Sequence, residues 1–193
     1  MTKGIIFILT LGVFSIINTE MGVVGILPLV AEEYGVTVAT AGLLVSLFAL
    51  IVAFAGPTMP LLFSRINRKK TMLLVLGVFT GCNLISAFAT TFPVVLAARV
   101  ISAFFQPVYV SMAMSVAGAS VSKEEAPKAV SKVMIGVSAG MVLGVPIVSY
   151  IANVTSLRMG MLFFAAVNAV ALIATVIAVP DLPEKEKLSY GSQ

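Results

Sequence analysis

The chain lacks histidine and tryptophan, has a single cysteine, and is poor in charge. Cys82 alone cannot form an internal disulfide, and without histidine or a cysteine cluster we expect no transition-metal site. Only 10% of the 193 residues are charged, against about 25% in a typical soluble domain. No nucleophile is paired with a base, and no glycine-rich loop carries a lysine for phosphate binding. We therefore expect neither an enzyme nor a cofactor site, and no nucleic-acid partner.

Apolar residues dominate instead: 60% of the chain is hydrophobic, and the mean hydropathy is +1.12. Six apolar runs are each long enough for a transmembrane helix, which needs about 20 residues. They span residues 4–30, 39–63, 71–89, 94–116, 129–152 and 159–179. No segment alternates in polarity as a barrel strand would. The sequence predicts an all-α integral membrane bundle over residues 1–179, with a polar, proline-containing tail, 180–193, as the start of a cytoplasmic interdomain linker.

Basic residues predict the orientation of the bundle. Ten of the twelve fall on one side if the six runs are helices: Lys3, four residues in 64–70, three in 118–132 and two in 180–193. Arg158 alone falls on the other side, and Arg99 lies inside a span. Because cytoplasmic loops carry the excess of lysine and arginine, both ends of this segment are expected in the cytoplasm of a multi-pass cell-membrane protein.

Two ionisable side chains, Glu20 and Arg99, lie at membrane depth. With 1.5 Å per helical residue, Glu20 is about 12 Å below the outer end of its span, and Arg99 is about 8 Å below the same surface. Such residues usually face a partner or a cavity. Apolar neighbours disfavour a charged carboxylate and a nearby arginine favours it, so Glu20 could take up and release protons. The alternative is a static Glu20–Arg99 bridge between two helices.

Neutral polar residues at similar depth are candidates for substrate binding. Ser102 and Gln106 follow Arg99 on one helical face, just before Pro107. Asn18 and Asn83 are the other two candidates, although each could simply hydrogen-bond a neighbouring helix. Asn18 lies roughly opposite Glu20 on an ideal helix. Both could face one point only if the helix unwinds, which the glycines that follow Glu20 would permit.

The fifth span contains "GVSAGMVLGVP", in which Gly136, Gly140 and Gly144 recur every fourth residue before Pro146. Small residues at this spacing allow two helices to approach closely. A helix with glycine and proline can also bend, as a gating element must. The pattern therefore predicts tight packing, with gating as a further function.

The motifs together resemble the N-terminal half of a major facilitator superfamily transporter. The similarity is to the bacterial drug:proton antiporter branch, which includes sugar-efflux and purine-efflux permeases. It rests on "NTEMGVVGILPLV" in the first span, "RVISAFFQPVYV" with Arg99 in the fourth, and the glycine motif in the fifth. In the connection "PLLFSRINRKK", Arg65, Arg68 and Lys69 fit the family's loop signature, whereas Ser64 stands where the family has aspartate.

The resemblance implies a twelve-helix fold of which this chain is one half, built from two inverted three-helix repeats. A second six-helix half, expected in the same native chain, would complete a site for a small-molecule substrate. Glu20 and Arg99 would then couple protons to the export of a small organic solute or drug by alternating access. The rival hypothesis is a non-transporting six-helix scaffold or regulatory protein, in which Glu20 and Arg99 form a structural bridge.

Overall fold

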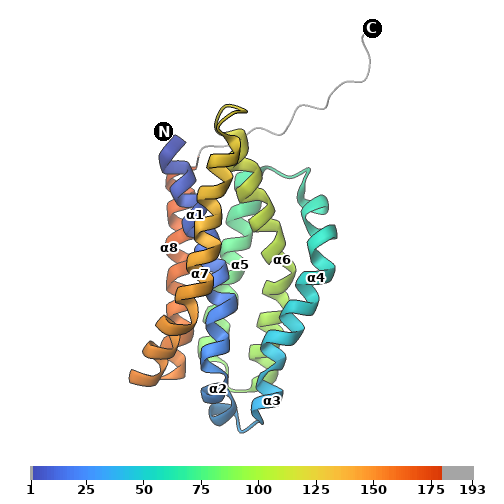
Figure 1. Ribbon diagram of the computed structural model, residues 1–193. Helices are drawn as coiled ribbons and strands as arrows, with labels where there is room; N and C mark the ends of the chain where they lie inside the picture. Colours follow the sequence, from blue (N-terminus) through green and yellow to red (C-terminus); the bar gives the residue numbers. More distant parts are fainter. Residues whose placement is uncertain (1, 180–193) are drawn as a thin grey trace.

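A computed structural model describes residues 2–179, and the tail 180–193 lies outside the described residues. The described chain is helical throughout, without a strand (Figure 1). Its elements are α1 (Thr2–Gly22), the 3-10 helix η1 (Val23–Ile26), α2 (Leu27–Tyr34), α3 (Val38–Ala41), α4 (Leu43–Phe63), α5 (Arg68–Phe88), α6 (Phe92–Ala119), α7 (Ala126–Val154) and α8 (Leu157–Ala178). Six segments are long and apolar enough to cross a membrane, which confirms the expected fold class.

The first span is longer than the apolar run indicated, because helix continues beyond Pro28 to Tyr34. Proline is tolerated in the first turn of a helix, where its missing N–H has no partner to lose. The span ends at Gly35, whose φ of 61° lies in the left-handed region that favours glycine. The other five spans agree with the apolar runs to within three residues at each end.

One of these small differences arises at a capping residue. The side chain of Asn67 accepts a hydrogen bond from the backbone N–H of Lys70 (3.2 Å). This cap starts α5 at Arg68, inside the basic stretch and before its apolar run. Arg68 and Lys69 of the loop motif thus belong to the first helical turn, whereas Arg65 lies in the connection.

The connections alternate between the two ends of the bundle. Figure 1 shows the start of α1, the α4–α5 connection and the α6–α7 connection at one end, with α2 and α3 at the other. The lysines and arginines of 65–70 and 123–132 therefore gather at the end where α1 begins. This arrangement is the one that the charge pattern predicts.

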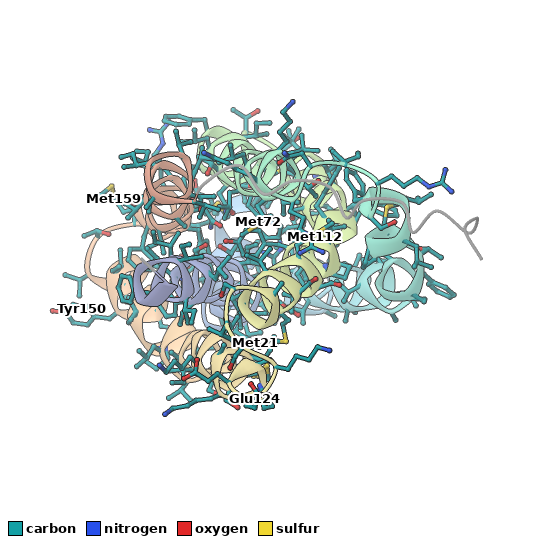
Figure 2. The ribbon with its side chains drawn as sticks, turned by 90° about the horizontal axis from the view of Figure 1, so that it is seen from above. Met21, Met72, Met112, Glu124, Tyr150 and Met159 are labelled. Atoms are coloured by element: carbon teal, nitrogen blue, oxygen red, sulfur yellow. The ribbon has the colours of Figure 1, made fainter. Side chains whose placement is uncertain are left out.

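The surface of the bundle is apolar around its circumference. Figure 2, seen along the bundle, shows Tyr150 and Met159 pointing outward from α7 and α8, and Met72 and Met112 lying inside. Tyr150 is 70% exposed, whereas Met72 is fully buried. The exposed apolar side chains around the bundle are unfavourable in water and favourable in lipid. The perimeter therefore suits a bilayer.

The most extensive contact between helices joins α1 to α7, and the glycine stripe lies in it (Figure 1). A methyl group added at Gly136 would collide with the carbonyl oxygen of Thr10. One added at Gly140 would lie 2.8 Å from Cβ of Ile17, and one at Gly144 would lie 3.2 Å from the carbonyl oxygen of Asn18. The glycines thus allow α7 to approach the backbone of α1. Gating by this segment and Pro146 stays a prediction.

Replacing Gly136 with alanine is expected to lower the free energy of unfolding by about 1–3 kcal/mol, because backbone must move to make room for the added methyl group. Gly77 in α5 is the matched control, since nothing lies within 4 Å of an added methyl group there. Gly77→Ala should be neutral or stabilising by up to about 1 kcal/mol. Melting temperatures of the purified variants would test this, and equal values for the two would contradict it.

Candidate functional site

The first span changes its helical geometry next to Glu20. The α-helix ends at Gly22, the 3-10 helix η1 covers Val23–Ile26, and Ile26 leaves helical geometry at φ −115° and ψ 6°. The first span therefore departs from α-helical geometry just after Glu20, at the glycine-containing segment.

Arg99 of α6 bonds the backbone of α1 beside this junction. Its guanidinium donates to the carbonyl oxygens of Thr19 (3.1 Å) and Glu20 (3.3 Å), just before the junction. The same group stacks on the ring of Phe48 in α4, 4.6 Å from the ring centroid. Arg99 is only 5% exposed. It therefore connects α1, α4 and α6 at a single buried point.

The Glu20 carboxylate has a different partner. Its Oε2 accepts a hydrogen bond from Nε2 of Gln106 (3.0 Å), one further residue of α6. In the described structure Arg99 bonds the backbone of this turn, and the hydrogen bond of the carboxylate comes from Gln106. The arrangement leaves Glu20 able to change its protonation state without releasing Arg99 from the helix.

A pocket of about 760 Å³ opens beside this turn, between α1, α4, α6 and α7. Of the four neutral candidates, Gln106 lines it, so one amide contacts both the pocket and the carboxylate. Ser102 is buried and donates to the carbonyl oxygen of Arg99 (2.9 Å). Asn83 is buried beside Arg99 in a separate small cavity.

Asn18 does not line the pocket. It is fully buried, and its backbone lies against Gly140 and Gly144 of α7. Within residues 2–179 its amide atoms have no hydrogen-bond partner. Gln106 therefore lines the pocket and links it to Glu20 by a hydrogen bond, whereas Asn18, Asn83 and Ser102 do not line it.

Thr19 and Asn168 belong to the same network, although the sequence analysis did not single them out. Asn168 of α8 donates to Oγ1 of Thr19 (2.8 Å) and is fully buried. Thr19 in turn offers its carbonyl to Arg99. The available signal was an asparagine in the middle of the very apolar sixth span, where an unsatisfied amide is costly. α8 thus reaches the Glu20 turn although it does not line the pocket.

Replacing Asn168 with leucine is expected to lower the free energy of unfolding by about 1 kcal/mol, a common value for buried polar contacts between transmembrane helices. Asn153 offers a matched control, because it is exposed and its amide donates within its own helix, to the Ser149 carbonyl (2.7 Å). Asn153→Leu should leave the melting temperature unchanged. An equal decrease in the melting temperature of both variants would show that the hydrogen bonds of Asn168 between helices do not stabilise the fold.

Comparison with known proteins agrees with this architecture. The family model described as Major Facilitator Superfamily matches residues 9–193. The chain is 36% identical over 173 residues to YtbD of Bacillus subtilis (strain 168), named an uncharacterized MFS-type transporter, covering 90% of this chain and 44% of that protein. It is 29% identical over 141 residues to the chloramphenicol resistance protein of Streptomyces lividans, covering 73% of this chain and 36% of that protein.

Among solved structures, the peptide transporter POT in complex with sulfate matches with a TM-score of 0.80 at 15% identity. The match covers 90% of this chain and 37% of POT, so it shows the fold. The chain thus spans less than half the length of the curated relatives named above. Six spanning helices, the family match over most of the sequence and this half-length coverage have one consistent explanation. The chain belongs to the major facilitator superfamily of membrane transporters.

Proposed function

We propose that the complete protein is a proton-coupled secondary transporter that exports a small organic solute by alternating access. One observation carries the proposal: Gln106 both lines the pocket and donates to the Glu20 carboxylate. An ionised carboxylate only accepts hydrogen bonds, whereas a protonated one also donates. Uptake of a proton by Glu20 therefore changes the hydrogen bonding available to Gln106, and with it the wall of the pocket.

Arg99 keeps the Glu20 turn in place through both protonation states, because it holds backbone carbonyls. In the proposed cycle a proton and a substrate favour different conformations, since a ligand shifts an equilibrium only by its differential affinity. A second six-helix half, in the same native chain, would close the open side of the pocket. The basic end of the bundle would face the cytoplasm of the cell membrane.

The scaffold hypothesis has less support from the described residues. A purely structural bridge requires the carboxylate and the guanidinium to bond each other, and here they bond Gln106 and backbone carbonyls. A scaffold also has no need for a pocket of about 760 Å³ between four helices. Both features favour a transporter.

Reconstitution of the complete native protein in proteoliposomes tests the proposal. We expect an imposed pH gradient to drive accumulation of at least one radiolabelled solute from a panel of chloramphenicol, glucose and adenine, and a protonophore to abolish it. Transport that is insensitive to the protonophore would contradict proton coupling. A folded protein that moves none of these solutes would favour the scaffold.

A further inference from the structure

A separate cavity of about 210 Å³, the end cavity, lies at the end of the bundle where α2 and α3 lie (Figure 1). Its walls come from the end of α2, the α5–α6 connection and the start of α8. Two hydrogen bonds hold these walls together. The Tyr34 hydroxyl donates to the Ala89 carbonyl (3.3 Å), and Nε of Arg158 donates to the Ala87 carbonyl (3.2 Å). The cavity is therefore a built feature of the fold, and the proposed function does not use it.

Two side chains of opposite charge line the end cavity without meeting each other. Glu33 comes from α2 and Arg158 from α8. The Arg158 guanidinium is fixed by its bond to Ala87 and by the ring of Phe88, whose centroid is 4.4 Å away. Among residues 2–179 its other N–H groups have no acceptor, and the Glu33 carboxylate forms no ion pair. The cavity thus offers a positive group and a negative group to a ligand.

The chemistry of these two groups selects a zwitterion. A guanidinium binds phosphate through its fork of N–H donors. Leu157, the first residue of α8, also lines the cavity, so the positive end of the helix dipole adds to the charge of Arg158. The Glu33 carboxylate can only accept hydrogen bonds when it is ionised, and a primary ammonium supplies them. A ligand with both a phosphate and a primary ammonium therefore satisfies both walls.

The end cavity lies on the part of the bundle that a second half would leave exposed to lipid. The large pocket that the second half would close is lined by α1, α4, α6 and α7, and neither α5 nor α8 contributes to it. Near the cavity α5 and α8 expose apolar side chains, among them Ile85 (54%), Phe88 (58%) and Met159 (46%). Figure 2 shows Met159 pointing outward. Acyl chains can therefore pack on α5 and α8 with their headgroup at the cavity.

We propose that the end cavity binds the headgroup of phosphatidylethanolamine, with the phosphate on Arg158 and the ammonium on Glu33. The volume of about 210 Å³ is smaller than the roughly 300–1,000 Å³ of pockets for drug-sized ligands, so it suits a headgroup whose chains stay outside. Phosphatidylcholine lacks N–H donors, and phosphatidylglycerol lacks the positive charge. The inference requires a bundle that spans the membrane, and it does not require proton-coupled transport.

Native mass spectrometry of the complete native protein, titrated in detergent micelles with these three lipids carrying identical acyl chains, tests the inference. We expect the first phosphatidylethanolamine to bind about fivefold more tightly than either other lipid, because exposed charge pairs are individually weak. Glu33→Gln should remove this preference. Glu32→Gln is the matched control and should retain it, since Glu32 is exposed on the same helix but does not line the cavity.

Arg158→Gln should weaken the binding of all three lipids about fivefold, because they share the phosphate. Arg158→Lys keeps the charge and should lose less. Lys123→Gln, exposed at the opposite end of the bundle, controls for the change in net charge and should bind normally. If Arg158→Gln does not fold, Glu33→Gln decides, since the Glu33 side chain holds no other described residue. No preference for phosphatidylethanolamine, an equal loss in a control variant, or displacement by inorganic phosphate would each overturn the inference.

Discussion

Replacement of Glu20 by glutamine is expected to reduce proton-driven transport by at least about 100-fold, equivalent to about 2.7 kcal/mol in the barrier of the coupled step. Glutamine has the shape of a protonated glutamate, and its side-chain oxygen can still accept the hydrogen bond from Gln106. It cannot release a proton, so a cycle that requires deprotonation stops. Ligand binding measured without a gradient should change less than about threefold, because Glu20 does not line the pocket.

The same variant should fold at least as well as the natural protein. A central charge in a transmembrane helix is unfavourable by about 2.5–3.5 kcal/mol on insertion scales, so removing it cannot weaken insertion. Glu32→Gln on α2 is the control, since Glu32 is exposed at the end of the same span opposite the start of α1. It should transport normally. Wild-type pH-driven transport by Glu20→Gln in proteoliposomes would show that this carboxylate is not the coupling group.

Replacement of Arg99 by lysine should lower both stability and transport, although the positive charge is retained. A lysine ammonium is a compact point charge, whereas the guanidinium here donates to two carbonyls and stacks on Phe48. Loss of one hydrogen bond from a charged group is worth about 1.5–3 kcal/mol, and we expect a decrease of about 2 kcal/mol in the free energy of unfolding. Transport should fall about tenfold as the Glu20 turn loosens.

Arg158 is the matched control for Arg99, because it makes the same two kinds of contact elsewhere in the bundle. Its Nε donates to the Ala87 carbonyl (3.2 Å), and its guanidinium lies 4.4 Å from the centroid of the Phe88 ring. It is exposed at the start of α8, so Arg158→Lys should cost less than about 1 kcal/mol and leave transport unchanged. Thermal unfolding and gradient-driven uptake of both variants would check this. If Arg99→Lys and Arg158→Lys transported equally well, Arg99 would have no part in the coupling mechanism.

Exchanging the two charges would not distinguish a proton site from a structural bridge. With Glu20→Arg and Arg99→Glu, the new carboxylate would face the carbonyl oxygens of Thr19 and residue 20, which offer it no donor. The exchange should therefore fail under either hypothesis. The single substitution Glu20→Gln is the more informative experiment, because it changes the proton chemistry while preserving the hydrogen bond with Gln106.

Hydropathy and charge in the sequence are sufficient to predict the six spans, the alternation of the basic connections and the similar depth of Glu20 and Arg99. Each of these properties depends on residues close together in the chain, or on counting along a helix. The glycines at every fourth residue of the fifth span also predicted that this span packs closely against another helix. The sequence alone did not identify that neighbour.

Only the tertiary structure decided which groups meet. Arg99 bonds the backbone carbonyls of Thr19 and Glu20, and carbonyl partners cannot be read from the sequence because every residue carries a carbonyl. Asn168 reaches Thr19 across 149 positions of sequence, and the backbone of Asn18 lies against the glycines of α7. The direction of each side chain depends on the rotation of its helix, and that rotation is set by packing against helices far away in the chain.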